Sequence, residues 1–448
     1  MIKKSFYLVA FALLAFLASC SSDDKEAFSR VVVDSETGLF EVVQGEGLVL
    51  KAFVESEKES ALQWYVNGKE VAGETQSTFV FKQEERGLYT VKLEAKNALG
   101  VASNQVEIEV YGRYREGAFV LNEGQMGKVP GSLIYISPKG DVVIEHAYEK
   151  ENGSKLGDSA QDLYIADGKI YILSQNGGND GQLIVADAET LKKEFAFSKE
   201  ELGLSAPTNL VVTGDYAFIR DSKGVHKLNI KTRKLTSIKG TEGARKNRMA
   251  VADGKIFSAA QKNLLIMDKT SLEAREVFFD GTISGIINGP KGYLWVSLAG
   301  DVNAICLVNP KDGSIKEMNK IEGVKLGSGQ AVSPAITAKG DTLYFTNEVS
   351  SWSLGKKIYR HIFSKEQTDM VVDVEKVVEN AGIVYGTVGV NPANGDLIFN
   401  TVKGFGNDFK INNLSVFNYN KAGELVLKNN YKDMLWFPAG SYFTAYFK

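Results

Sequence analysis

The stretches Ala166-Asp-Gly-Lys-Ile-Tyr171 and Ala252-Asp-Gly-Lys-Ile-Phe257 decide the fold. Each is an Asp-Gly pair followed by apolar and aromatic residues, and the two begin 86 residues apart. An Asp-Gly pair before such a run indicates a tight β-hairpin, because both residues tolerate the left-handed backbone that two-residue hairpins require. The repetition indicates that one structural unit is used more than once.

The same turn-and-strand pattern occurs seven times. Aligned on one apolar position, the copies follow one another at intervals of 38 to 54 residues, a loose period typical of propeller blades. A second turn-bounded pair of strands follows most copies, so we expect four strands in each blade. The sequence therefore predicts an all-β protein with a seven-bladed β-propeller. The copies are residues 117–122, 168–173, 215–220, 254–259, 292–297, 341–346 and 395–400.

The two ends of this repeat region indicate how the ring closes. The first copy has no inner strand before it, whereas an apolar strand at residues 440–447 follows the last copy. We expect this C-terminal strand to supply the missing inner strand of the first blade. Closure of this kind removes exposed sheet edges. The propeller is predicted to cover residues 113–448.

Residues 1–20 have the pattern of an export signal. Lys3 and Lys4 precede an apolar run, and Leu17-Ala18-Ser19-Cys20 ends it with small residues before a cysteine. This looks like a bacterial lipobox, which implies a lipid on Cys20. Residues 21–29 form an acidic tether similar to the export signal of surface lipoproteins of Bacteroidetes, although a plain spacer has the same composition. The expected location is the outer membrane, with the protein lipid-anchored and facing the exterior.

Residues 30–112 predict a small β-sandwich. Residues 63–70 contain an Asn-Gly hairpin turn, and residues 87–96 alternate between polar and apolar side chains. Trp64 and Tyr89 lie in strands and are expected in the core. The segment resembles PKD-like and Ig-like domains. It lacks their disulfide, because the chain has two cysteines and one of them is Cys20.

Composition and motifs argue against several functions. Lys and Arg number 52 against 55 Asp and Glu, with no basic block, so nucleic acid is not expected as a partner. The three histidines are scattered, and no P-loop, serine elbow or metal-ligand spacing is present. We therefore predict a protein that is not an enzyme and has no cofactor or metal. A group of carboxylates near the pore keeps a lyase-type enzyme as an alternative: Glu123, Asp162, Asp221 and Glu348.

Loop lengths place the expected ligand site. Tight turns on one face of the propeller leave little room for a pocket, whereas the connections on the other face are long and varied. That face carries aromatic, cationic and amide side chains suited to a large, flat or anionic ligand. Trp436 has a second interpretation, as a side chain that fills the point where the ring closes. Arg245 and Arg248 also have a second interpretation, as ordinary solvated charges. The predicted ligand-binding residues are Gln175, Arg220, Arg245, Arg248, Gln261, Trp352, Phe405 and Trp436.

The lipobox, the PKD-like segment and the repeats together resemble YncE-like propeller lipoproteins of Bacteroidetes. The resemblance implies capture of a ferric siderophore of the enterobactin type and its delivery to a TonB-dependent outer-membrane transporter. Cobalamin capture by the same architecture is the first alternative. A glycan-binding or protein-binding propeller is the second. The resemblance implies no individual binding residue.

Overall fold

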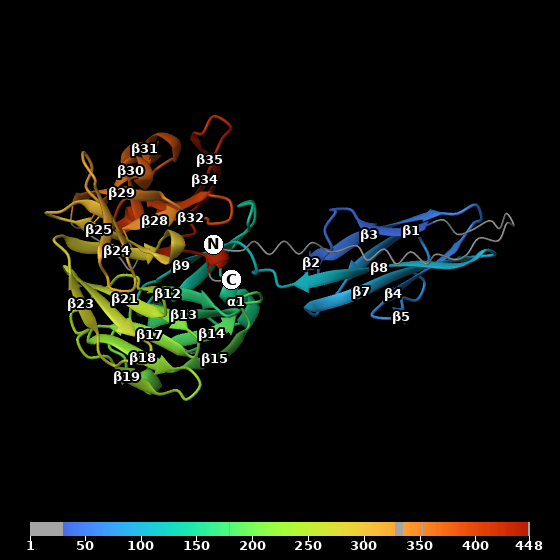
Figure 1. The fold of residues 1–448 in the computed structure, drawn as a ribbon, viewed down its shortest axis with the longest axis horizontal. Helices are drawn as coiled ribbons and strands as arrows, with labels where there is room; N and C mark the ends of the chain where they lie inside the picture. Colours follow the sequence, from blue (N-terminus) through green and yellow to red (C-terminus); the bar gives the residue numbers. More distant parts are fainter. Residues whose placement is uncertain (1–29, 179, 328–334, 351–352, 447–448) are drawn as a thin grey trace. The chain divides into compact units, whose positions relative to one another are not determined.

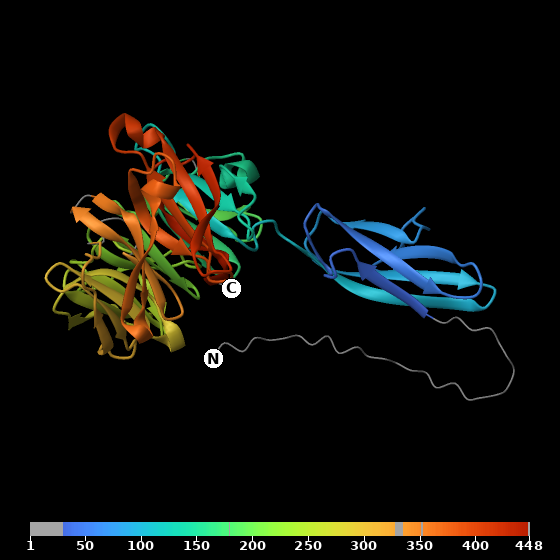
Figure 2. The same ribbon diagram turned by 90° about the horizontal axis from the view of Figure 1, so that it is seen from above.

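The computed structural model describes residues 30–178, 180–327, 335–350 and 353–446, drawn in colour in Figures 1 and 2. The chain divides into two compact units, Met1–Arg113 and Tyr114–Lys448. Within the described residues, no helix is both long enough and apolar enough to cross a membrane.

The first unit is a β-sandwich of two sheets, with strand orders β1-β3-β6 and β2-β8-β7-β4-β5. Strand β7 alternates as its sequence predicts, with Val91 and Leu93 fully buried and Leu88 63% exposed. Trp64 is also fully buried, and its indole N–H donates to the carbonyl of Gln76 over 2.9 Å. The strands are β1 (Arg30–Ser35), β2 (Glu41–Val43), β3 (Gly47–Glu55), β4 (Ala61–Val66), β5 (Lys69–Glu70), β6 (Thr78–Lys82), β7 (Gly87–Asn97) and β8 (Gly100–Tyr111).

The second unit contains seven four-stranded sheets among its described residues, which follow one another around a ring from green to red in Figure 1. The inner strands are β36 (Pro438–Phe443), β12 (Asp158–Ala166), β16 (Asn209–Thr213), β20 (Ala250–Ala252), β24 (Thr282–Asn288), β28 (Ile336–Lys339) and β32 (Ile383–Val390). The second strands are β9 (Ala118–Asn122), β13 (Lys169–Asn176), β17 (Tyr216–Asp221), β21 (Lys255–Ala260), β25 (Leu294–Ala299), β29 (Thr342–Ser350) and β33 (Leu397–Val402).

The outer half of each blade is a second hairpin. The third strands are β10 (Ser132–Ile136), β14 (Leu183–Asp187), β18 (Gly224–Asn229), β22 (Asn263–Asp268), β26 (Ala304–Val308), β30 (Ser353–Ile362) and β34 (Asn412–Tyr419). The fourth are β11 (Val143–Ile144), β15 (Lys193–Phe197), β19 (Leu235–Ser237), β23 (Arg275–Phe278), β27 (Ile315–Lys320), β31 (Gln367–Asp373) and β35 (Leu425–Lys432). Short helices in the connections are α1 (Ala147–Asn152), α2 (Lys199–Leu202), α3 (Val374–Val377), η1 (Pro290–Gly292), η2 (Phe363–Lys365), η3 (Gly406–Lys410) and η4 (Thr444–Tyr446).

The ring closes through the C-terminal strand, so the predicted all-β fold and its closure are confirmed. Strand β36 pairs with β9, with Ser441 opposite Val120 and Tyr442 opposite Phe119. Each inner strand also contacts the next, from β36 through β12, β16, β20, β24, β28 and β32 back to β36. The first blade is therefore assembled from both ends of the propeller sequence.

The repeated Asp-Gly turn has the predicted physical cause. Asp167 and Gly168 have φ angles of 51° and 72°, and Asp253 and Gly254 have 50° and 70°. Positive φ at both central residues defines the type I′ turn, whose twist matches that of the flanking strands. Both turns therefore join an inner strand to a second strand.

Apolar contacts between neighbouring blades form the core. Strands β9 and β26 are buried along their whole length, because blades pack against both of their faces. Their sequences are accordingly continuous apolar runs rather than alternating ones. Cys306 lies in β26 as a buried free thiol, and burial raises its pKa to about 12.

Candidate functional site

The strand order gives the propeller two distinct ends. The connections from second to third strands, and from fourth strands to the next inner strand, lie at one end, which we call the upper face. The turns between inner and second strands lie at the other end, the lower face. Every inner strand therefore runs from the upper face toward the lower face, and its last residues lie near the lower face.

The described residues predicted to bind a ligand lie in upper-face connections or at the upper ends of second strands. Trp352 and the lipidation residue Cys20 lie outside the described residues. The others occupy strand ends or connections of several blades, and the structure brings few of them into contact. They are Gln175, Arg220, Arg245, Arg248, Gln261, Phe405 and Trp436.

Arg220 holds a loop in place. Its Nε and Nη2 donate to the carbonyl of Ala244 over 3.0 and 2.9 Å, and Nη1 donates to Thr208 Oγ1 over 3.1 Å. Burial lowers the pKa of this guanidinium, although the nearby Asp221 opposes that effect. With most of its donors engaged, Arg220 stabilises the β19–β20 connection rather than presenting a free cation.

Arg245 is the predicted cation that remains available on the upper face. Its side chain is partly exposed, and Nη1 lies 3.5 Å from Oε1 of the exposed Gln261. Arg245 and Gln261 are thus neighbours, as a shared ligand site requires.

The aromatic residues of the upper face behave differently from one another. Phe405 is 57% exposed in the β33–β34 connection. Trp436 is half-buried in the connection that leads into β36, and its ring lies edge-on to Phe437 with 6.2 Å between centroids. Phe437 in turn stacks on Phe409 at 4.1 Å. The interpretation of Trp436 as a filling side chain fits its position at the closure, while Phe405 is open to solvent.

The four carboxylates have different surroundings, and Glu348 lies in β29, where its backbone N–H donates to the carbonyl of Lys325 over 3.0 Å. Glu123 accepts a hydrogen bond from Gln161 Nε2 over 2.7 Å, and burial raises its pKa. Asp221 instead contacts His226, with 2.8 Å between Oδ1 and Nε2. Asp162 lies in the channel. Among the described residues, no three His, Cys, Asp or Glu side chains are arranged to hold a metal.

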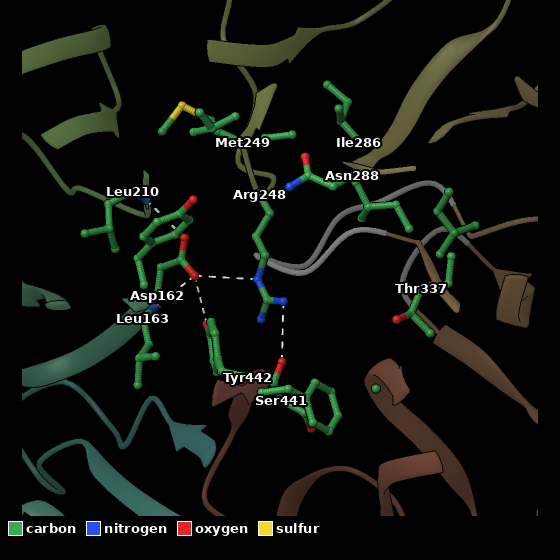
Figure 3. A pocket seen from close by; sticks show the side chains of 18 of the residues that line it. Asp162, Leu163, Leu210, Arg248, Met249, Ile286, Asn288, Thr337, Ser441 and Tyr442 are labelled. Carbon is green, nitrogen blue, oxygen red and sulfur yellow. Dashed lines mark hydrogen bonds and ion pairs between the residues drawn. The ribbon is translucent and has the colours of Figure 1, made fainter. Parts of the chain in front are cut away.

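A cavity occupies the propeller channel, and we call it the channel cavity (Figure 3). Its cavity volume is about 180 Å³, and it is partly open to solvent. All seven inner strands contribute to its lining, which consists of residues 162–164, 210, 248–251, 286–288, 336–338, 388, 389 and 441–443.

The channel cavity extends along the channel rather than lying at one end of it. Strands β24 and β36 line it with their last residues, such as Asn288 and Phe443, whereas β16, β20 and β28 line it with residues at their beginnings, such as Leu210 and Ile336. Asn288 is exposed and Thr337 is partly exposed, so the cavity has access to solvent near these residues.

Asp162, Arg248 and Tyr442 form a buried polar cluster in the cavity wall (Figure 3). The Tyr442 hydroxyl donates to Asp162 Oδ1 over 2.9 Å, and Arg248 Nε lies 3.6 Å from the same oxygen. The guanidinium lies over the Tyr442 ring, 4.1 Å from its centroid. Arg248 therefore belongs to the channel and not to the set of surface loop residues.

The Asp162 carboxylate has more hydrogen-bond partners than the Arg248 guanidinium beside it. Its Oδ2 accepts from the backbone N–H of Leu210 over 3.0 Å, and Oδ1 accepts from that of Leu163, also over 3.0 Å. Burial raises the pKa of Asp162, and Arg248 with these hydrogen bonds opposes that rise. Arg248 Nη2 has no hydrogen-bond partner among the described residues, and neither does Ser441 Oγ.

Sequence reasoning missed Tyr442 and Ser441. The closing strand was predicted, and as an inner strand it borders the channel. That closure was a usable signal, because residues of the C-terminal strand would then lie beside inner strands far away in the sequence.

Comparisons with known proteins agree with this architecture. A family model described as a domain of unknown function, DUF5074, matches residues 116–444. The chain belongs to the DUF5074 family. A PKD domain model matches residues 38–110. No curated protein matches.

Solved structures similar to this DUF5074 protein have low sequence identity to it. A quinonprotein alcohol dehydrogenase-like protein from Bacteroides thetaiotaomicron has 16% identity and a TM-score of 0.56, covering 90% of this chain and 96% of that chain. The computationally designed Ika8 protein has 10% identity and a TM-score of 0.41, covering 71% of this chain and 88% of that chain. At such identities the likeness extends to the fold alone.

Proposed function

We propose that this DUF5074 protein is a surface lipoprotein that captures a ferric siderophore of the enterobactin type on the upper face of its propeller. It then delivers the complex to a TonB-dependent outer-membrane transporter. In this role it carries no cofactor and catalyses no reaction. The lipobox-like sequence before Cys20 and the resemblance to YncE-like lipoproteins support the location and the transport role.

One structural observation carries the choice of ligand. The upper face presents the partly exposed Arg245, whose Nη1 lies 3.5 Å from the amide oxygen of Gln261, together with the solvent-exposed ring of Phe405. A ferric catecholate is an anion whose surface consists largely of aromatic rings. Guanidinium groups and aromatic faces bind such a surface through charge and stacking.

Cobalamin is the second candidate, and the amide of Gln261 favours it. This side chain is exposed beside Arg245, where it can hydrogen-bond the amides that surround a corrin ring. Ionic strength separates the two ligands. Binding of a trianion weakens as salt is added, whereas binding of a nearly neutral corrinoid does not.

The test is a calorimetric titration of the non-lipidated protein, residues 21–448, with ferric enterobactin and separately with cyanocobalamin at two salt concentrations. We expect saturable, salt-sensitive binding of the siderophore that Phe405→Ala weakens several-fold. Binding of cyanocobalamin alone would replace the first proposal with the second. Binding of neither would reject both and direct attention to glycans or a protein partner.

A further inference from the structure

The channel cavity is chemically different from the upper face. Its walls are mainly apolar, with Leu163, Met249, Ile286 and Val388 among them. Its aromatic surface is supplied by Tyr164 of β12 and by Tyr442 and Phe443 of the closing strand. A flat apolar ligand would remove this surface from water, and this burial favours binding by about 25 cal/mol for each Å² of apolar surface.

The unsatisfied polar atoms lie together in one part of the wall. Arg248 and Ser441 both line the cavity, and Arg248 Nη1 lies 3.5 Å from the carbonyl oxygen of Ser441. Ser441 is 7% exposed, yet its hydroxyl has no partner among the described residues, like Nη2 of Arg248. Buried donors left without acceptors are costly, so the site favours a molecule that brings acceptor oxygens.

The unpaired donor of Arg248 favours a carboxylate over a neutral acceptor, because hydrogen bonds between charged groups are stronger. Asp162 receives hydrogen bonds from Leu163, Leu210 and Tyr442, while Arg248 approaches it only through Nε at 3.6 Å. Because Nη1 already approaches the carbonyl oxygen of Ser441, Nη2 is the outer donor that is left for a second anion. Arginine presents two parallel donors at its outer edge, which match the two oxygens of a carboxylate.

We infer that the channel cavity is a binding site for a small monocarboxylate with a flat apolar body. Arg248 and Ser441 hold the carboxylate, and the apolar body lies between the inner strands. This site does not depend on the siderophore proposal, because it uses other residues and lies in the channel rather than on the upper connections.

The test is a calorimetric titration of residues 21–448 with 2-naphthoate, with 2-naphthamide as the neutral compound of the same shape. We expect 2-naphthoate to bind at least ten-fold more tightly than the amide. Arg248→Gln should remove this preference, and Ser441→Ala should weaken the carboxylate several-fold. Arg245→Gln is the matched control, because it removes an upper-face arginine and should change neither affinity.

Arg248→Gln leaves Asp162 without its cation, so the melting temperature of each variant is measured first. If that variant does not fold, Ser441→Ala and Arg248→Lys test the inference in its place. Arg248→Lys is informative because the lysine keeps the positive charge but loses the paired donors. No saturable binding of 2-naphthoate, equal affinity for the amide, or wild-type affinity in folded Ser441→Ala and Arg248→Lys would each overturn the inference.

Discussion

The upper face and the channel cavity show two ways in which one propeller can present an arginine. Arg245 lies on a surface connection, partly exposed, with an amide as its nearest polar neighbour. Arg248, three residues later, lies between inner strands against Asp162 and Tyr442. The difference teaches that two residues of one connection can have very different environments: Arg248 lies two residues before the inner strand β20 and reaches the channel, whereas Arg245 lies five residues before it and stays at the surface.

The largest expected effect is on the buried pair. Asp162→Ala leaves Arg248 without its carboxylate in the channel, and removing one partner of a buried pair costs about 3–5 kcal/mol of unfolding free energy. Chemical denaturation measures this loss. Asp215→Ala is the control, because Asp215 and Lys231 form an exposed pair worth about 0–1 kcal/mol. Equal losses in the two variants would remove the distinction between channel and surface charges.

A smaller effect is expected from filling space in the channel. Gly389 lines the cavity, and an added Cβ would lie 2.9 Å from Cζ of Phe443 and 3.0 Å from Cβ of Ser441. Gly389→Ala should cost about 1–3 kcal/mol by overpacking and should weaken 2-naphthoate. Gly243→Ala on the upper face is the matched control, because its Cβ would meet only Ala260 at 3.6 Å. If Gly389→Ala proves as harmless as Gly243→Ala in thermal unfolding, the channel is less tightly packed at this point than we describe.

A substitution on the upper face should change ligand affinity and leave the free energy of unfolding nearly unchanged. Arg245→Gln removes a cation from a partly exposed position, so the unfolding free energy should change by less than about 0.5 kcal/mol. Affinity for ferric enterobactin should fall about five-fold to ten-fold at low salt, with a smaller loss at high salt as screening increases. Titrations at two ionic strengths measure this. An unchanged siderophore affinity would remove Arg245 from the site.

The smallest effect concerns a buried histidine away from both regions. His361 Nδ1 lies 2.9 Å from Thr368 Oγ1, and Nε2 lies 3.1 Å from Asn319 Nδ2, so the neutral ring satisfies both neighbours. Burial lowers the pKa of His361 below 6.5, although Glu366 opposes this. The unfolded chain therefore binds a proton first as pH falls.

Stability from His361 is consequently complete above pH 6.5 and is lost as the pH falls below that value toward the lowered pKa of the folded state. His361→Gln should flatten the dependence of unfolding free energy on pH between about 7.5 and 5.5 by less than about 1 kcal/mol. Parallel denaturation series at these pH values measure the difference. A wild-type slope in this variant would assign the dependence to other groups.

The fold could be predicted from the sequence to a large extent, because it depends on local patterns. Asp-Gly turns such as Asp167-Gly168 reveal their hairpins, and the unpaired C-terminal strand reveals the closure. The site could be predicted only in part. Arg248, Asp162 and Tyr442 come from three different blades, 86, 194 and 280 residues apart in pairs, and their contact depends on the ring geometry. Likewise, the sequence could not show that the carbonyl of Ala244 would accept hydrogen bonds from the Arg220 guanidinium.

The most direct test of the account is a co-occupancy titration. Residues 21–448 are saturated with 2-naphthoate and titrated with ferric enterobactin, and the reverse order is then measured. The account predicts that each ligand binds with nearly the same affinity, within about two-fold, whether or not the other is present, because the upper face and the channel cavity are separate sites. Mutual exclusion of the two ligands, or weakening of both by either Arg245→Gln or Arg248→Gln, would contradict it.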